Sequence, residues 1–162
     1  MVISPPQGMG AANGDANANK LIKFSLDSFP MPTEENAEIK LPYGNEFRYV
    51  AGMTTFSDET LVIKDFCDIA TSSMVDKWRR AVYDPDTGEI GLAKNYKCDG
   101  EVWMFGPGGI QQFCRKWKLW GVWPKSVKFG EGKMGDATDN KITIVLKVDK
   151  ITFLGQQGAT NA

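Results

Sequence analysis

The sequence predicts a mainly β domain: an antiparallel β-barrel or orthogonal β-sandwich of about seven or eight strands, with one flanking α-helix at about residues 69–82. Two observations lead to this prediction. Apolar residues recur at every second position in several runs, which is the period of a half-buried strand. Gly, Pro, Asn and Asp separate these runs at hairpin spacing, and only one convincing stretch has the helical period.

The first strand is expected at residues 20–29, where apolar and polar side chains alternate until Pro30 and Pro32 end the run. Residues 37–50 are then typical of a long hairpin, because Gly44 and Asn45 lie between two extended runs. Pro42 has no N–H to donate, which restricts this hairpin to an edge or a projecting position.

A strand at residues 60–66 precedes the helix. Residues 68–83 carry an apolar stripe at helical spacing, with charged residues outside it. Asp68 or a following Ser or Thr can cap the helix start. The stripe consists of Met74, Val75, Trp78, Ala81 and Val82.

The second half of the chain returns to β structure. Turn or loop residues at 84–89, 106–109 and 130–140 interrupt it. Strands are expected at residues 96–105, 110–124, 126–129 and 141–153. In the last strand, one face has a clean period of two and is formed by Ile142, Ile144, Leu146 and Val148.

Three regions are expected along the chain. Residues 1–19 are rich in Gly, Ala, Asn and Pro and predict a flexible arm, or alternatively an arm that orders against a partner. Residues 20–154 form the β domain, and residues 155–162 form a loose C-terminal tail. The N-terminus has neither a basic region nor a long apolar run, so neither a signal peptide nor a membrane anchor is expected.

Composition excludes several classes of function. Lys and Arg number 19 against 20 Asp and Glu, a balance that argues against a chain that grips nucleic acid over its whole surface, although a local patch is compatible with it. Histidine is absent, which removes the commonest general base and metal ligand. Cys67, Cys98 and Cys114 are scattered and indicate reduced thiols of a cytoplasmic protein, with an intermolecular disulfide as the alternative.

Two motifs resemble ligand sites but lack the necessary context. Gly130, Gly132 and Gly135 match GxGxxG, yet a strand follows them instead of the helix that would hold a pyrophosphate. Asp84 and Asp86 resemble the start of a calcium loop, which lacks its glutamate at the twelfth position. We therefore expect no cofactor and no metal.

Catalytic arrangements are equally weak. The adjacent carboxylates of Asp58 and Glu59 have no sequence signal for burial or for separated pKa values. Cys114 is followed by two basic residues that can lower a thiol pKa, but no histidine is present to act as its base. The chain is not expected to be an enzyme, and no catalytic residue is assigned.

Three tryptophans lie within seven positions, at Trp117, Trp120 and Trp123. In a regular strand, Trp117 and Trp123 share one face and Trp120 points to the other, so the three do not form one stacking platform. We expect at least one of Trp117 and Trp123 in the core and Trp120 in a contact with another subunit. Basic residues between these aromatics keep single-stranded nucleic-acid binding open as an alternative.

Two long stretches resemble tail tube proteins of contractile-tailed bacteriophages. WKLWGVWPKSVKFGEGKMGDATDNKITIVLKVDKITF, at 117–153, is similar to the family's apolar strand, Gly-x-Trp-Pro turn, short strand, polar loop and final alternating strand. FRYVAGMTTFSDETLVIKDF, at 47–66, is similar to its Ala-Gly and Thr-Phe run before a strand and a peripheral helix. The arm at 1–19 and the three cysteines depart from the family pattern.

The resemblance implies a structural virion protein whose hexameric rings stack into the hollow inner tube of a contractile tail. The implied partners are further copies of the chain, the sheath, baseplate and terminator proteins, and DNA that passes through without specific binding. The implied location is the virion tail, assembled in the host cytoplasm. Tubes of type VI secretion systems and phage-like bacteriocins are related alternatives. The expected subunit contacts are Lys40, Leu41, Tyr43, Asn45, Phe47 and Trp120.

Overall fold

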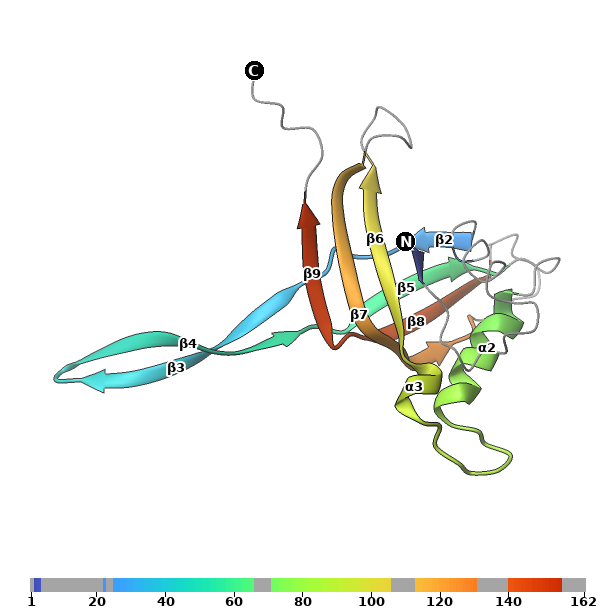
Figure 1. The fold of residues 1–162 in the computed structure, drawn as a ribbon, viewed down its shortest axis with the longest axis horizontal. Coiled ribbons are helices and arrows are strands. Elements are labelled where there is room, and N and C mark those ends of the chain that lie inside the picture. Colours follow the sequence, from blue (N-terminus) through green and yellow to red (C-terminus); the bar gives the residue numbers. More distant parts are fainter. Residues whose placement is uncertain are drawn as a thin grey trace, which may run out of the picture.

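The computed structural model describes residues 2–3, 22, 25–65, 71–105, 113–130 and 140–155 (Figure 1). Within these ranges the chain is mainly β, with one long helix, one single-turn helix and two further helical positions at Ile22 and Ser25. The strands are β1 (Val2–Ile3), β2 (Leu26–Ser28), β3 (Glu34–Tyr43), β4 (Glu46–Phe56), β5 (Glu59–Lys64), β6 (Cys98–Phe105), β7 (Phe113–Lys128), β8 (Lys141–Lys147) and β9 (Lys150–Gly155); the helices are α2 (Thr71–Val82) and α3 (Ala93–Tyr96).

Seven strands form one antiparallel sheet in the order β1-β6-β7-β8-β5-β2, with β9 beside β7. The long strand β7 changes partner along its length. Its residues 116–120 pair with β9, whereas residues 123–128 pair with β8. The sheet therefore curls around β7, and β5 and β8 cross behind β6 and β7 (Figure 1). This architecture confirms the predicted antiparallel barrel or sandwich with one flanking helix.

The change of partner takes place at Gly121, whose φ of +62° is the left-handed conformation that glycine adopts without strain. The register of β7 against β6 also shifts here, between Leu119 and Val122. The predicted boundary between strands 110–124 and 126–129 is therefore wrong. The Gly-x-Trp-Pro segment bends the strand without ending it, and β7 continues to Lys128.

The predicted strand at 141–153 is also divided. β8 ends at Lys147 and β9 begins at Lys150, with a tight turn between them. The backbone N–H of Asp149 in this turn donates to the carbonyl of Trp120 at 3.0 Å. The turn directs β9 back along the first half of β7, and local alternation cannot reveal this reversal.

The core lies between the two layers of the curled sheet and beneath α2. The predicted face of Ile142, Ile144, Leu146 and Val148 is confirmed, since each of these side chains is at most 2% exposed. They pack with the buried Leu61, Ile63, Leu119, Val122, Val75 and Trp78. Burial of each such side chain stabilises the fold by about 1.5–3 kcal/mol.

Helix α2 is held at this core by Trp78. Its side chain is 2% exposed, and its indole N–H donates to the carbonyl of Tyr96 at 2.9 Å, linking α2 to α3. The expected helix at 69–82 is confirmed for the described part, Thr71–Val82. Asp68, one of the expected caps, lies outside the described residues.

The predicted strand at 20–29 is only partly correct. Leu26–Ser28 forms β2, but Ile22 and Ser25 have helical backbone. Both side chains are at most 5% exposed, and their spacing of three residues fits one side of a helical turn better than one face of a strand.

Several expected segments fall outside the described residues. These are the tail beyond Gly155, the turn at 106–109, most of the loop at 130–140, and the arm at 1–19 apart from β1. Val2 and Ile3 of β1 pair with Glu101 and Gly100 of β6. In the part of the chain that is described, no helix has the length and apolar character needed to cross a membrane.

Candidate assembly interface

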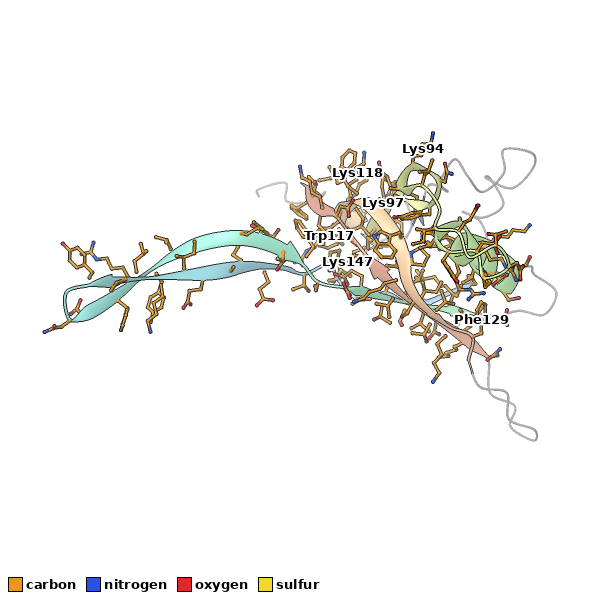
Figure 2. All side chains as sticks on the ribbon, turned by 90° about the horizontal axis from the view of Figure 1, so that it is seen from below. Lys94, Lys97, Trp117, Lys118, Phe129 and Lys147 are labelled. Atoms are coloured by element: carbon orange, nitrogen blue, oxygen red, sulfur yellow. The ribbon has the colours of Figure 1, made fainter. Side chains whose placement is uncertain are left out.

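β3 and β4 form a separate two-stranded sheet that projects far from the rest of the molecule (Figures 1 and 2). The pairing extends from Glu34↔Phe56 at the root to Tyr43↔Glu46 at the tip. The predicted hairpin at 37–50 is therefore correct in kind and in its turn at Gly44 and Asn45, but its strands are longer. Pro42 is accommodated because, among the described strands, β3 pairs with β4 alone.

The hairpin exposes apolar side chains on both faces. The two faces can be assigned because directly opposed residues of an antiparallel pair share a face. Ile39 pairs with Val50 and Leu41 with Arg48, and these residues lie on the face of Tyr43. The other face carries Lys40, Pro42, Phe47 and Tyr49. Between 46% and 62% of each of Ile39, Leu41, Tyr43, Phe47, Tyr49 and Val50 is exposed.

The two cations near the tip cover aromatic rings of their own face. Lys40 Nζ lies 3.9 Å from the centroid of the Phe47 ring, and Arg48 Cζ lies 3.9 Å from that of Tyr43. Among the described residues, neither cation forms an ion pair with a carboxylate. Both charges therefore remain available to an acidic partner.

The root of the hairpin is fastened to the body through Glu59. Its Oε1 accepts a hydrogen bond from the backbone N–H of Thr33 at 3.1 Å, and the N–H of Ser57 donates to the carbonyl of Thr33 at 3.3 Å. Glu59 is only 2% exposed. Burial raises the pKa of this carboxyl, the charge of Asp58 adds to the rise, and the hydrogen bond from Thr33 opposes it.

Asp58 makes the second attachment. Its carboxylate pairs with Lys125 Nζ at 2.5 Å and with Lys147 Nζ at 2.8 Å, and Lys147 also donates to the carbonyl of Phe56 at 3.3 Å. Hydrogen bonds from the two lysines hold the pKa of Asp58 below its usual value. The carboxylate pair noted in the sequence thus anchors both strands of the hairpin, and it differs from the expected solvated pair because Glu59 is buried and the two pKa values shift in opposite directions.

Trp120 lies on the other face of β7 from the buried Leu119, as the alternation predicted. Its indole N–H donates to Thr152 Oγ1 at 3.2 Å, and Lys118 Nζ lies 3.5 Å from its ring centroid. The side chain is 38% exposed. Trp117, on the core face, is partly buried and contacts Phe153 at 5.6 Å between ring centroids.

The expectation that Trp123 shares the face of Trp117 is wrong. The irregularity at Gly121 places both Leu119 and Val122 in the core, so alternation is reversed beyond this point. Trp123 pairs with Lys147, which lies on the face away from Leu146, and its ring contacts Tyr96 at 5.9 Å.

The structure thus brings five of the six expected contact residues together on the hairpin, while Trp120 lies on a separate surface of the body. The sequence reasoning missed Ile39, Tyr49, Val50 and Met53, which share the same exposed hairpin; Met53 is 79% exposed. Apolar residues at both parities over residues 39–50 were the signal, because a strand with one buried face shows only one parity.

The rejected motifs have other roles. Asp84 and Asp86 lie 3.8 and 2.7 Å from Arg80 Nη1, so they form an ion-pair cluster on the surface.

Nowhere in the described ranges do three metal-ligating side chains gather. Cys98 is buried, and Cys114 is half-buried; both are free thiols.

The comparisons identify the fold. No family model matches the sequence, and no curated protein matches it. A chain of the anti-feeding prophage cap, the AFP tube terminating cap, matches with a TM-score of 0.64 at 15% identity, over 79% of this chain and 78% of that one. The sheath/tube terminator of the PVC extracellular contractile injection system matches with a TM-score of 0.65 at 13% identity, over 80% of this chain and 85% of that one.

This is the fold of contractile-injection tube and terminator proteins. A type six secretion system protein also matches, with a TM-score of 0.52 at 11% identity over 94% of this chain and 80% of that one. The resemblance to tail tube proteins is therefore confirmed at the level of the fold.

Proposed function

We propose that this protein is a non-enzymatic tube subunit whose hexameric rings stack into the hollow inner tube of a contractile phage tail. In this role the tube penetrates the host envelope and conducts the genome. The observation that carries the proposal is the β3–β4 hairpin, which exposes apolar side chains on both faces and projects from a fold shared with tube and terminator proteins.

A two-stranded hairpin is at best marginally stable in water when nothing packs on it. Exposed apolar surface of this extent usually marks a protein interface. Assembly supplies the missing cover when the hairpin of one copy packs on other copies. Lys40, Leu41, Tyr43, Asn45 and Phe47 are then contact residues, and Trp120 contributes to a second contact.

The free edge of β9 supports ring formation. Within the described part of the sheet, β9 pairs with β7 alone, which leaves one row of its backbone N–H and carbonyl groups available. Unpaired strand edges favour association with another chain. Joining such edges between copies around a closed ring removes them from solvent.

The proposed partners follow from this role. They are further copies of the chain, a sheath, a baseplate and a terminator, with DNA passing through the lumen without specific binding. The proposed location is the virion tail, after assembly in the host cytoplasm. Tube subunits of a bacteriocin or a secretion system have the same structural role, and the particle that contains the protein distinguishes them.

The test is assembly of the purified protein, measured by light scattering and negative-stain electron microscopy. Rings or tubes are expected for the wild type. A variant with Tyr43→Ser and Phe47→Ser is expected to be folded and unable to stack. Met31→Ser is the matched control, because Met31 is 45% exposed outside the hairpin. A wild-type protein that stays monomeric at all concentrations contradicts the proposal.

Binding of single-stranded nucleic acid receives less support. Lys118 already covers one side of the Trp120 ring at 3.5 Å, so a base can stack there only if the lysine moves. This alternative predicts salt-sensitive binding of an oligothymidine that Trp120→Ala weakens. If the protein does not bind the oligothymidine at low salt, the alternative of single-stranded nucleic-acid binding is excluded.

A further inference from the structure

The hairpin requires a receiving surface, and two groups of exposed apolar side chains on the described part of the body are the candidates. One is the free end of the β6-β7-β9 sheet, where Met104, Phe105, Phe153 and Leu154 are 40–54% exposed. The other is the segment after α2, residues 83–92, which we call the α2–α3 turn. In it Tyr83, Ile90 and Leu92 are 49%, 78% and 63% exposed.

The α2–α3 turn is internally braced despite this exposure. Tyr83 and Ile90 form an isolated antiparallel bridge, the N–H of Asp84 donates to the carbonyl of Glu89 at 3.1 Å, and the N–H of Gly88 donates to the carbonyl of Asp84 at 2.8 Å. A braced turn loses little conformational entropy when it is bound. Its apolar side chains are thus presented to solvent by an ordered segment.

Charge distinguishes the two surfaces. The α2–α3 turn contains Asp84, Asp86 and Glu89 and no basic residue. Two of these carboxylates pair with Arg80, whereas Glu89 has no ion-pair partner among the residues described. The strand end of β7 instead carries the basic residues Arg115, Lys116 and Lys118; Lys116 pairs with Glu101 at 3.2 Å, which leaves Arg115 and Lys118 as its unpaired cations among the described residues.

The distal half of the hairpin, residues 39–50, is apolar and carries Lys40 and Arg48 against the single acid Glu46. The two cations have no carboxylate partner in the described structure. They are complementary to the acidic turn and are repelled by the basic strand end, and such complementarity fixes which surfaces associate.

We propose that residues 39–50 of one copy dock on the α2–α3 turn of a second copy. This inference rests on the proposed function. The hairpin and the turn lie at opposite ends of the molecule (Figure 1). A contact between two different surfaces of identical chains repeats from copy to copy, and it produces either closed rings or open helical stacks.

The contact is tested by photo-cross-linking of the full chain under assembly conditions. Tyr43 is replaced by benzoylphenylalanine, and the cross-linked peptides are identified by mass spectrometry. We expect cross-links to peptides that contain residues 83–92 of another copy. Assemblies whose cross-links fall on β6, β7 or β9 overturn this inference and leave the proposed function intact. A protein that forms no assembly overturns both.

A charge exchange provides the second measurement. Glu89→Lys and Lys40→Glu are each expected to raise the concentration at which half of the protein assembles by roughly tenfold, and the combined variant is expected to recover most of this loss. Glu35→Lys is the matched control, because Glu35 lies on the exposed hairpin outside residues 39–50. Circular dichroism checks that each variant is folded. Equal assembly by the single variants and the wild type contradicts the contact.

Discussion

The carboxylate of Asp149 lies directly against Gly121 and occupies the space that a side chain there would need, so Asp149 has to move if a Cβ atom is added. A Cβ atom at Gly121 would lie 2.7 Å from Cγ and 3.1 Å from Cβ of Asp149. The Gly121 N–H donates to Asp99 Oδ1 at 3.2 Å, and Asp149 pairs with Lys97 at 2.5 Å. Two segments distant in sequence therefore meet where β7 exchanges β9 for β8.

Gly121→Ala is expected to destabilise the fold by about 2–4 kcal/mol, since it combines left-handed strain with a collision against a carboxylate. Gly88→Ala is the matched control. Gly88 has a φ of +74° but nothing within 4 Å of an added Cβ, so it isolates the conformational strain of about 1–2 kcal/mol. Urea denaturation measures both changes. Equal decreases in the free energy of unfolding for the two variants would contradict a steric collision between the added Cβ at Gly121 and Asp149.

Glu59 is expected to make the protein less stable as pH rises. Because its folded-state pKa is raised above the ordinary 4.5, the folded chain holds this proton to a higher pH than the unfolded chain. Its contribution to the free energy of unfolding is therefore fully present below 4.5 and is lost as pH rises through the folded-state pKa.

Glu59→Gln keeps an oxygen that can accept from Thr33 N–H but removes the titration. The stability of this variant relative to the wild type is expected to increase between about pH 4 and pH 7. Chemical denaturation at several pH values measures the difference. A difference that does not change with pH shows that the Glu59 pKa is not raised.

Asp58 is expected to act in the opposite direction. Its folded-state pKa is lowered from 3.8 by hydrogen bonds from Lys125 and Lys147, so its contribution is present above 3.8 and is lost as pH falls through the folded-state value. Asp58→Asn should cost about 1 kcal/mol at neutral pH, and the cost should vanish in strong acid. Glu35→Gln, on the exposed hairpin, is the control. A loss that persists in acid indicates a packing effect and argues against an ion pair.

Cys98 is expected to resist alkylation in the folded protein. Burial, with a smaller effect of Asp99, raises the pKa of its thiol to about 12, and Sγ donates to the carbonyl of Val122 at 3.4 Å. At about pH 8, iodoacetamide should modify Cys114, which is half-buried, well before Cys98. Peptide mass spectrometry after short exposure, with urea-unfolded protein as the reference, gives the two rates. Comparable alkylation rates of Cys98 and Cys114 in the folded protein would contradict this prediction.

Local sequence patterns were sufficient to predict several features of this protein. Alternation identified the buried face from Ile142 to Val148, helical spacing identified α2, and Gly44 with Asn45 marked the hairpin tip. These features depend on side chains within a few positions of one another, so the period and the turn residues are sufficient to predict them.

Which faces of the strands meet depends on contacts between distant segments. The irregularity at Gly121 reverses the alternation of β7, and it therefore moves Trp123 away from the face of Trp117. Glu59 becomes a buried anchor only because Thr33, 26 positions earlier, returns to the root of the hairpin. Bulges and partner exchanges are fixed by contacts between segments far apart in the chain, and a local pattern contains no information on such contacts.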